Sequence, residues 1–326
     1  MYNNKLRNRI KFTSLILTLV LILSTFNFAF AEEAKLKVEK VTNYLDHKPA
    51  LVFLTDFGVK DGAVSAMKGV AFGVDPELKM FDLTHEIPNY DIWEGAYRLK
   101  QTCKYWPKGT VFVAVVDPGV GTERNSIVLK TKDGYYFVGP DNGLFTLVAE
   151  DMGIEEVRKI DETKNRLKGS EKSHTFHGRD VFAYTGAKLA SGTISYKEVG
   201  PKLENKIVTI PYQKAALKNN TAMGNIPILD VEYGNVWSNI PDEMFSKLNP
   251  KIGEMFKVEI YDKDKLVYKG TIPYVNSFGD VEEGKPLLYT NEMLNISAAI
   301  NMDSFAEVNK VESGADWTIK ITKIAK

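Results

Sequence analysis

The sequence predicts an N-terminal α/β domain with a largely parallel sheet, followed by a small all-β, barrel-like C-terminal domain. From residue 50 onward, short continuous apolar runs alternate with stretches of helical periodicity, which is typical of parallel strands covered on both faces. Beyond residue 225 the helical periodicity mostly disappears, and short alternating strands follow one another with turn residues between them. The chain has 326 residues, of which 44% are hydrophobic, enough for two domains of ordinary size.

Residues 1–31 have the features of a secretory signal peptide. A basic start is followed by the apolar run LILTLVLIL (15–23) and by the small residues Ala29 and Ala31, which fit a cleavage site. An uncleaved membrane anchor is the alternative. The sequence therefore predicts an exported protein, secreted or held at the cell surface or in the periplasm. Residues 32–48 form a charged lead-in.

Charge and cysteine content exclude several classes of protein. Removal of residues 1–31 takes away four positive charges and no negative ones, which changes the net charge from zero to −4. A mildly acidic chain gives no reason to expect nucleic acid as a partner. Cys103 is the only cysteine, so the chain has neither an intrachain disulfide nor a cysteine metal cluster.

The first domain, residues 49–205, is expected to begin with a strand and then to alternate helices and strands. Its third strand, TVFVAVV, is the strongest strand signal in the chain, and a hairpin should turn at Asp133 and Gly134. The predicted strands are 50–54, 78–83, 110–116, 126–131 and 135–139, and the predicted helices are 61–74, 91–106 and the segment after His177.

Residues 206–224 are polar and rich in lysine, and we expect them to be a linker. The C-terminal domain then comprises residues 225–326. Its short alternating strands suggest a small antiparallel barrel or sandwich. They are predicted at 225–233, 255–262, 265–272, 285–291 and 317–324.

Polar residues follow several of the predicted parallel strands, where ligands of α/β sheets usually bind. In LTDFGVKDG, Asp56 follows the first strand and is well placed to accept the hydroxyls of a ribose, while Asp61 can cap the next helix. In VVDPGVGTER, Asp117 ends the third strand, and the glycine-rich loop can return Arg124 to it. The alternatives are that Asp56 and Asp61 only organise the turn, and that Asp117 and Arg124 form a structural ion pair.

Two other segments carry candidate residues. His177 in TFHGRD precedes a helix; such a histidine is usually structural, unless it faces Asp117 across the end of the sheet. In DVEYGNVWSNIP (230–241), an acid, an amide and aromatic rings suit a nucleoside with an ammonium group, or the segment is simply a hairpin that turns at Gly234.

Six segments in order resemble one family, the S-adenosyl-L-methionine hydroxide adenosyltransferases, which are relatives of the fluorinase and chlorinase. The resemblance covers the chain from about residue 50 to the C-terminus. The segments are TDFGVKDGAVSAMKGV, FDLTHEIPNYDIWEGA, VVDPGVGTERNSI, VGPDNGL, TFHGRDVFA and YGNVWSNI.

The resemblance implies a homotrimer in which the substrate lies between the N-terminal domain of one subunit and the C-terminal domain of its neighbour. It also implies that water or hydroxide attacks S-adenosylmethionine to give adenosine and L-methionine, with no cofactor. By motif, the water-activating residues of the family are Asp117, Arg124 and His177. The substrate-binding positions are Asp56 at the ribose, Asp230 at the methionine ammonium, Phe278 and Asn301 at the adenine, and Asp61, Tyr90, Tyr233, Asn235 and Trp237.

The family resemblance also distinguishes hydrolysis from halogenation. The halogenases lack the Asp–Arg–His set, and an anionic Asp117 would repel a halide but can orient a water. We therefore expect Asp117 and His177 to hold the water and accept its proton, with Arg124 orienting Asp117. One departure lies in YTNEMLNIS (289–297): Glu292 and Met293 stand where the family usually has small residues with serine and glycine.

Two other functions fit the same residues. A metal-dependent phosphoesterase would bind Mg²⁺ or Mn²⁺ through carboxylates and histidines at the strand ends. An exported nucleoside-binding protein would use the pocket without turnover. The ligands in the first case would be Asp56, Asp61, Asp117, His174 and His177.

Overall fold

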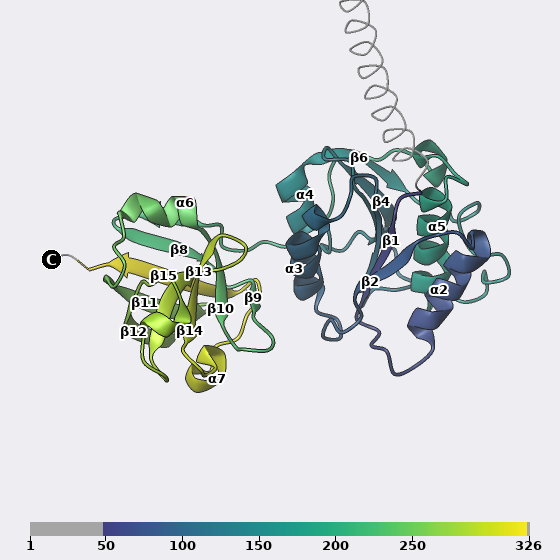
Figure 1. Ribbon diagram of the computed structural model, residues 1–326. Coiled ribbons are helices and arrows are strands. Elements are labelled where there is room, and N and C mark those ends of the chain that lie inside the picture. The colour runs from purple at the N-terminus through teal and green to yellow at the C-terminus, as the bar shows by residue number, and fades with distance from the viewer. Residues whose placement is uncertain (1–47, 325–326) are drawn as a thin grey trace, which may run out of the picture. The chain divides into compact units, whose positions relative to one another are not determined.

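The computed structural model describes residues 48–324 (Figure 1). Residues 49–326 group into one unit, to which both parts described below belong. The expected signal peptide, residues 1–31, and nearly all of the lead-in, residues 32–48, lie outside the described residues. Among the described residues, no helix has the length and apolar character needed to cross a membrane.

Six strands form the sheet of the α/β part, in the order β2-β1-β3-β5-β4-β6. β1 is parallel to β2 and β3, and β3 is parallel to β5, whereas β4 is antiparallel to β5 and β6. The predicted α/β fold with a largely parallel sheet is confirmed. The strands are β1 (Leu51–Thr55), β2 (Met80–Thr84), β3 (Val111–Val115), β4 (Ser126–Thr131), β5 (Tyr136–Pro140) and β6 (Ile154–Lys159).

Helices cover both faces of this sheet (Figure 1). On one face α2 and α5 share a core with Leu51 and Val113, and on the other α3 and α4 share a core with Val52 and Phe112. Successive side chains of a strand point to opposite faces, so the continuous apolar runs supply both cores. The helices are α2 (Ala63–Val74), α3 (Ile92–Thr102), α4 (Thr146–Met152) and α5 (Tyr184–Ala190), with 3-10 turns η1 (Cys103–Tyr105) and η3 (Tyr196–Val199) and the π-helix η2 (Gly178–Ala183).

Local sequence signals explain where these elements begin and end. The side chain of Asp91 caps α3, because its Oδ1 accepts a hydrogen bond from the backbone N–H of Glu94 at 2.8 Å. The predicted hairpin joins β4 to β5, and Gly134 adopts a φ of 91° in the turn. The helix expected over 91–106 is shorter: it ends at Thr102 and continues as η1.

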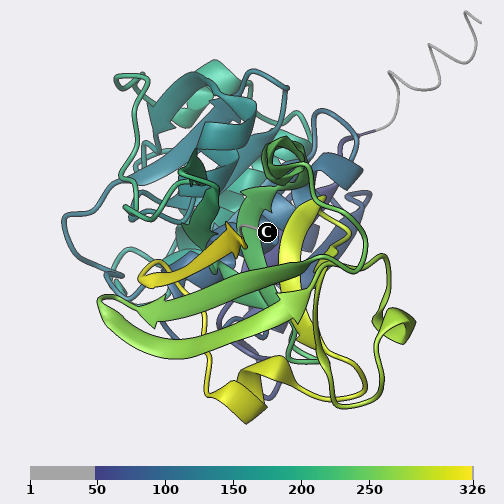
Figure 2. The ribbon, with the colours of Figure 1, turned by 90° about the vertical axis from the view of Figure 1, so that its left-hand side faces the viewer.

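Two antiparallel sheets form the C-terminal part (Figure 2). One has the order β13-β14-β10-β9 and the other β12-β11-β15-β8-β7, and side chains from both sheets enter one core. This confirms the predicted all-β character. The strands are β7 (Ala216–Lys218), β8 (Thr221–Asn225), β9 (Ile228–Leu229), β10 (Val236–Pro241), β11 (Met255–Asp262), β12 (Lys265–Pro273), β13 (Pro286–Thr290), β14 (Asn295–Ile300) and β15 (Trp317–Lys323), and the helical turns are α6 (Asp242–Phe245), η4 (Ser246–Leu248), η5 (Phe278–Asp280) and α7 (Phe305–Asn309).

The prediction of a linker over residues 206–224 is wrong at its C-terminal end, where the structure has strands. β7 lies within it, and β8 begins within it and pairs with β15 from Thr221 to Asn225. The polar, lysine-rich composition of residues 206–224 predicts a linker and does not reveal that β8 begins at Thr221. The place of β8 depends on partners far away in the sequence, including Asn239, whose Oδ1 accepts a hydrogen bond from the Asn225 N–H at 2.8 Å.

Candidate active site

A carboxylate and a guanidinium are clamped together beyond the end of β3. Arg124 donates from Nε to both oxygens of Asp117, at 3.0 and 3.1 Å, and from Nη2 to Oδ2 at 2.5 Å. Its Nη1 donates to Ser126 Oγ at 2.9 Å. The side chains of Asp117 and Arg124 are only 4% and 10% exposed. The turn depends on Gly121, which has a φ of 77° and whose missing Cβ would lie 2.8 Å from a backbone oxygen of His174.

His177 joins this pair. Its Nδ1 lies 3.1 Å from Arg124 Nη2, and a guanidinium only donates, so Nδ1 is the acceptor. Burial, and next the charge of Arg124, lower the pKa of His177 below its ordinary value of 6.5. The neutral ring therefore carries its proton on Nε2, and this nitrogen has no hydrogen-bond partner among residues 48–324. His177 immediately precedes the π-helix η2, a kind of helix that is frequent at functional sites.

Asp117 faces a cavity of about 440 Å³ that it shares with Asp56. Asp56 Oδ2 accepts a hydrogen bond from the backbone N–H of Tyr90 at 2.9 Å, and Tyr90 has a φ of 70°. Asp61 also lines the cavity, while its Oδ1 accepts from the N–H of Ala63 at the start of α2, at 2.8 Å. The other described residues of its wall are Phe57, Ala63, Asn89, Tyr90, Thr175 and Phe176.

A buried histidine that was not among the predicted site residues braces the turn that carries Asp56. His85 Nδ1 lies 2.8 Å from Thr55 Oγ1, and the His85 backbone oxygen accepts from the Gly58 N–H at 2.7 Å. His85 Nε2 lies 3.0 Å from Asp82 Oδ1, and Asp82 in turn binds Lys68. The sequence signal was the histidine directly after β2, in FDLTHEIPNY. Its contacts with Thr55 depend on the pairing of β1 with β2.

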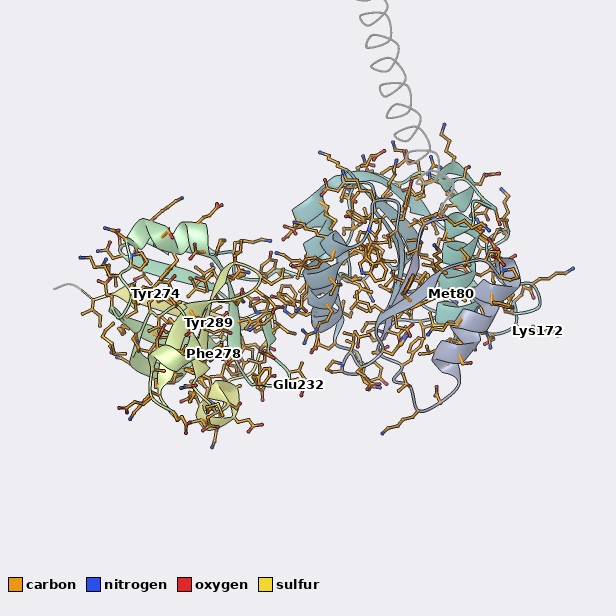
Figure 3. All side chains as sticks on the ribbon, in the orientation of Figure 1. Met80, Lys172, Glu232, Tyr274, Phe278 and Tyr289 are labelled. Carbon is orange, nitrogen blue, oxygen red and sulfur yellow. The ribbon has the colours of Figure 1, made fainter. Side chains whose placement is uncertain are left out.

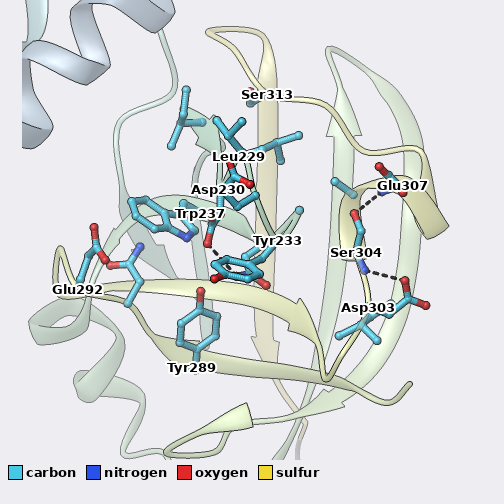
Figure 4. A pocket seen from close by; sticks show the side chains of 18 of the residues that line it. Leu229, Asp230, Tyr233, Trp237, Tyr289, Glu292, Asp303, Ser304, Glu307 and Ser313 are labelled. Atoms are coloured by element: carbon cyan, nitrogen blue, oxygen red, sulfur yellow. Dashed lines mark hydrogen bonds between the residues drawn. The ribbon is translucent and has the colours of Figure 1, made fainter. Parts of the chain in front are cut away.

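The C-terminal candidates line a second, larger cavity of about 1040 Å³ (Figure 4). Asn235 Nδ2 donates to Asp230 Oδ2 at 3.0 Å, and the Gly234 N–H donates to the backbone oxygen of Asp230 at 2.8 Å in the turn between β9 and β10. The segment is therefore a hairpin that also lines a cavity, and its role in binding a nucleoside stays a prediction. The sequence-predicted residues in this wall are Asp230, Tyr233, Asn235, Trp237, Phe278 and Asn301.

Aromatic rings provide part of the apolar wall of this second cavity. Phe278 packs against Tyr289 with ring centroids 4.9 Å apart (Figure 3). Asn301 Nδ2 donates to the backbone oxygen of Val281 at 2.9 Å. Glu292, which the sequence marked as unusual, lines the cavity, whereas Met293 packs against the apolar cluster around Trp93.

The structure thus brings the predicted residues together in two groups rather than one. Asp56, Asp61, Tyr90 and Asp117 share the first cavity, and the C-terminal candidates share the second. No described residue lines both cavities, although the loop 86–90 contributes to each.

Three of the residues proposed for a phosphoesterase, Asp56, Asp61 and Asp117, line the first cavity, but they do not form a group of metal ligands. Within the part of the chain that the structure describes, no three histidine, cysteine, aspartate or glutamate side chains form a group that could hold a metal ion.

Comparison with known proteins gives a consistent assignment. The profile of the SAM hydroxide adenosyltransferase N-terminal domain matches residues 51–200, and that of the C-terminal domain matches residues 224–318. An (R)-S-adenosyl-L-methionine hydrolase of Methanocaldococcus jannaschii is 38% identical over 255 residues, which are 76% of this chain and 92% of that protein.

A fluorinase of an Actinoplanes species is 27% identical over 300 residues, covering 84% of this chain and 98% of the relative. The crystal structure of an uncharacterized conserved protein from Thermotoga maritima superposes with a TM-score of 0.76 at 33% identity, covering 84% of this chain and all of that one. Both domain models match, in that order along the chain, and the chain therefore belongs to the SAM hydroxide adenosyltransferase family.

Proposed function

We propose that this protein hydrolyses S-adenosyl-L-methionine to adenosine and L-methionine. Several relatives are named (R)-S-adenosyl-L-methionine hydrolase, and the family supports the same substrate here. The observation that carries the proposal is the carboxylate of Asp117, clamped by Arg124 and facing the same cavity as Asp56. The phosphoesterase and the binding protein without turnover gain no support from these relatives.

The reaction is a displacement at the 5′ carbon of the ribose. The oxygen of water forms a bond to this carbon, the carbon–sulfur bond breaks, and its electron pair goes to sulfur as neutral thioether. One proton of the water is released. The sulfonium is already a good leaving group, so the enzyme has to position and activate the water; positioning alone can contribute ~7–11 kcal/mol.

In this proposal Asp117 accepts the proton, and His177 acts by a different route than the sequence suggested. The Nδ1 lone pair of His177 is occupied by Arg124, so the neutral ring cannot take a proton there without losing that contact. Its Nε2–H is a buried donor with no partner in the described chain, and we assign the water oxygen to it as acceptor, although His177 is not among the described residues that line the first cavity. Arg124 keeps the Asp117 carboxylate in one orientation.

The remaining candidates would bind the substrate. We assign the ribose hydroxyls to Asp56, the ammonium group to Asp230 and the adenine to Phe278 and Asn301. We place Asp61, Tyr90, Tyr233, Asn235 and Trp237 around them. No cofactor is needed for a displacement whose leaving group is a sulfonium.

We further propose that the enzyme works as a homotrimer with sites between subunits. The two groups of candidates line separate cavities within one chain, and a neighbouring copy can bring the second group to the first. Mixing an Asp117→Asn chain with an Asp230→Asn chain, assayed at substrate concentrations well below the native KM, tests this. Recovery of activity in the mixture is expected, because some interfaces then contain both native residues. Activity no greater than that of the separate variants would contradict the shared site.

Export through residues 1–31, with cleavage after Ala31, is also proposed from the sequence. The expected result is a protein in the medium or at the cell surface that begins at Glu32. N-terminal sequencing of the protein from cells and medium checks it, and a chain retaining its first residues in the membrane would favour an anchor.

The decisive experiment uses ¹⁸O-labelled water. The full chain is incubated with S-adenosyl-L-methionine, and mass spectrometry locates the label. We expect one ¹⁸O atom in the 5′-hydroxyl of adenosine and none in methionine. Unlabelled adenosine, or no adenosine at all, would exclude hydrolysis at the 5′ carbon. Separate incubations with the (R) and (S) epimers at sulfur show which epimer the chain hydrolyses. The relatives are named for the (R) epimer.

A further inference from the structure

The guanidinium of Arg124 has one contact that the proposed reaction does not use. Nε and Nη2 donate to Asp117, and Nη2 also faces His177, but Nη1 donates to Ser126 Oγ at 2.9 Å. Ser126 is the first residue of β4 and is only 3% exposed. Because a guanidinium only donates, the Ser126 oxygen is the acceptor in this contact, and its single hydrogen is left for another partner.

That partner is Glu162. Ser126 Oγ donates to Glu162 Oε1 at 3.3 Å, so the carboxylate turns the hydroxyl hydrogen away from Arg124 and leaves a lone pair facing Nη1. Without this acceptor the hydroxyl could rotate, and its hydrogen would then oppose the N–H of Arg124. Glu162 is not among the described residues that line the first cavity. It therefore acts on Arg124 through Ser126.

Arg166 fixes the other oxygen of Glu162. Its Nη1 donates to Glu162 Oε2 at 2.7 Å, and its side chain is only 7% exposed, against 37% for Glu162. Nε donates to Ser170 Oγ at 3.2 Å, and Nη2 donates to the backbone oxygens of Ser170 and Ser173. Because a nearly buried charge is costly unless it is paired, these contacts hold Glu162 against the segment that leads to His177.

The same segment packs on the loop that carries Arg124. Gly121 lies so close to it that a Cβ there would be 2.8 Å from the backbone oxygen of His174. Thr175 and Phe176 then line the first cavity. Arg166 and Gly121 thus both contact the stretch 170–176, which forms part of the cavity wall.

The charges of this network reach the site. Burial and then the charge of Arg124 lower the pKa of His177. Glu162 next raises it, Arg166 lowers it and Asp117 raises it. The opposite effects of Glu162 and Arg166 partly cancel, so this ion pair can hold its neighbours in place with a small net effect on the charge of His177.

We propose that Ser126 and Glu162 are positioning residues, which hold Arg124 in the orientation that keeps Asp117 ready to accept the proton of water. The inference rests on the proposed function and adds two residues to its mechanism. Contacts along one edge of a guanidinium allow it to pivot about that edge, and the contact at Nη1 prevents this pivot. No bond at Ser126 or Glu162 forms or breaks in the reaction.

A double-mutant cycle tests whether Glu162 acts through Ser126. Values of kcat and KM for S-adenosyl-L-methionine are measured for the full chain, for Ser126→Ala, for Glu162→Gln and for the double variant. The amide of Glu162→Gln has one oxygen, which can serve Ser126 or Arg166 but not both. Denaturant unfolding shows that each variant is folded under the assay conditions.

We expect Ser126→Ala to lower kcat about tenfold and Glu162→Gln to lower it about fivefold. KM should change less than about threefold, because the contact of Asp56 lies elsewhere, at Tyr90. The double variant should be no slower than Ser126→Ala. Glu155→Gln is the matched control, since Glu155 pairs with Lys130 on the same sheet, at 2.7 Å, and its variant should keep the native kcat.

A measurement without substrate separates this inference from the proposed function. Exchange of the Arg124 Nε proton with solvent is followed by NMR in the ligand-free full chain, and Arg124→Lys identifies the signal. We expect Ser126→Ala and Glu162→Gln each to speed this exchange about tenfold, the double variant to speed it no further than Ser126→Ala, and the control to leave it unchanged.

Two outcomes would overturn the proposal. One is exchange of the Arg124 Nε proton at the native rate in Ser126→Ala. The other is that Glu162→Gln slows kcat by the same factor in the Ser126→Ala chain as in the native chain. If the native chain releases no adenosine while exchange quickens as expected, hydrolysis fails and the positioning of Arg124 stands.

Discussion

The two cavities are built in different ways. In the first, Asp117 and Arg124 are nearly buried and each oxygen of the carboxylate is fixed by a guanidinium N–H. In the second, Tyr233 is 70% exposed and Glu292 is also exposed. A proton acceptor must be held in place before the substrate arrives, whereas a binding wall can adjust to its ligand. The contrast predicts that changes in the first cavity alter turnover and changes in the second alter affinity.

The largest effect is expected for Asp117→Asn. The amide keeps the shape of the side chain but cannot accept the proton of water, so kcat should fall roughly 100-fold or more. The dissociation constant for substrate should stay within a factor of about three. Single-turnover rates and calorimetry measure the two quantities separately. Near-normal turnover would remove Asp117 from the mechanism.

A smaller effect, of the opposite kind, is expected for Asp230→Asn. Loss of one charge-assisted hydrogen bond should raise KM about tenfold, a change of ~1.4 kcal/mol, while kcat changes little. Steady-state kinetics at saturating substrate check this. A variant whose kcat falls with an unchanged KM would show that the second cavity contributes to the chemical step, and the contrast between the cavities would be lost.

His85 allows a test of how the first cavity is held. His85→Ala should lower the free energy of unfolding by ~1–3 kcal/mol, because it removes the buried hydrogen bond with Thr55 and the contact with Asp82, and should raise KM by loosening the turn that carries Asp56. His85→Asn can still reach Thr55, as Nδ1 does, and His85→Gln can reach Asp82 instead. If the Thr55 contact holds the turn, His85→Asn should have a lower KM than His85→Ala and His85→Gln. Equal KM values in all three variants would show that His85 contributes only to stability.

The smallest effect concerns pH. Because the pKa of folded His177 lies below its ordinary value of 6.5, the unfolded chain binds more protons between the two values. The contribution of His177 to stability is therefore complete above pH 6.5 and is lost as the pH falls below it. Denaturant unfolding between pH 5 and 8, compared with a His177→Asn variant, measures it. The free energy of unfolding of the native chain should fall more on acidification than that of the variant. If both free energies fall equally with pH, the pKa of His177 is not lowered by folding.

The sequence predicted best those features that depend on neighbouring residues. The range of β11, residues 255–262, coincides with its alternating pattern, and the cap at Asp91 follows from one side chain and one turn. α4 and β6 were not predicted, because Thr146–Met152 is only seven residues long and β6 has a mostly polar, partly exposed sequence. These elements owe their stability to packing on β4 and α3, which no local pattern reveals.

The motifs identified the candidate residues, but only the folded structure shows which of them lie together in each cavity. The contact of His177 with Arg124 spans 53 positions and that of His85 with Thr55 spans 30. The sequence could not show that the Nδ1 atom of His177 is already occupied, nor that the unusual Glu292 shares a wall with six other acids. It did indicate that the segment containing Glu292 departs from its relatives.

The separation of the two cavities within one chain has a kinetic consequence. If each productive site combines the first cavity of one copy with the second cavity of another, the number of working sites depends on how many chains meet. Specific activity would then fall on dilution and return on concentration, with a lag set by the rate of encounter. An enzyme released into a large volume would lose its activity simply by spreading out.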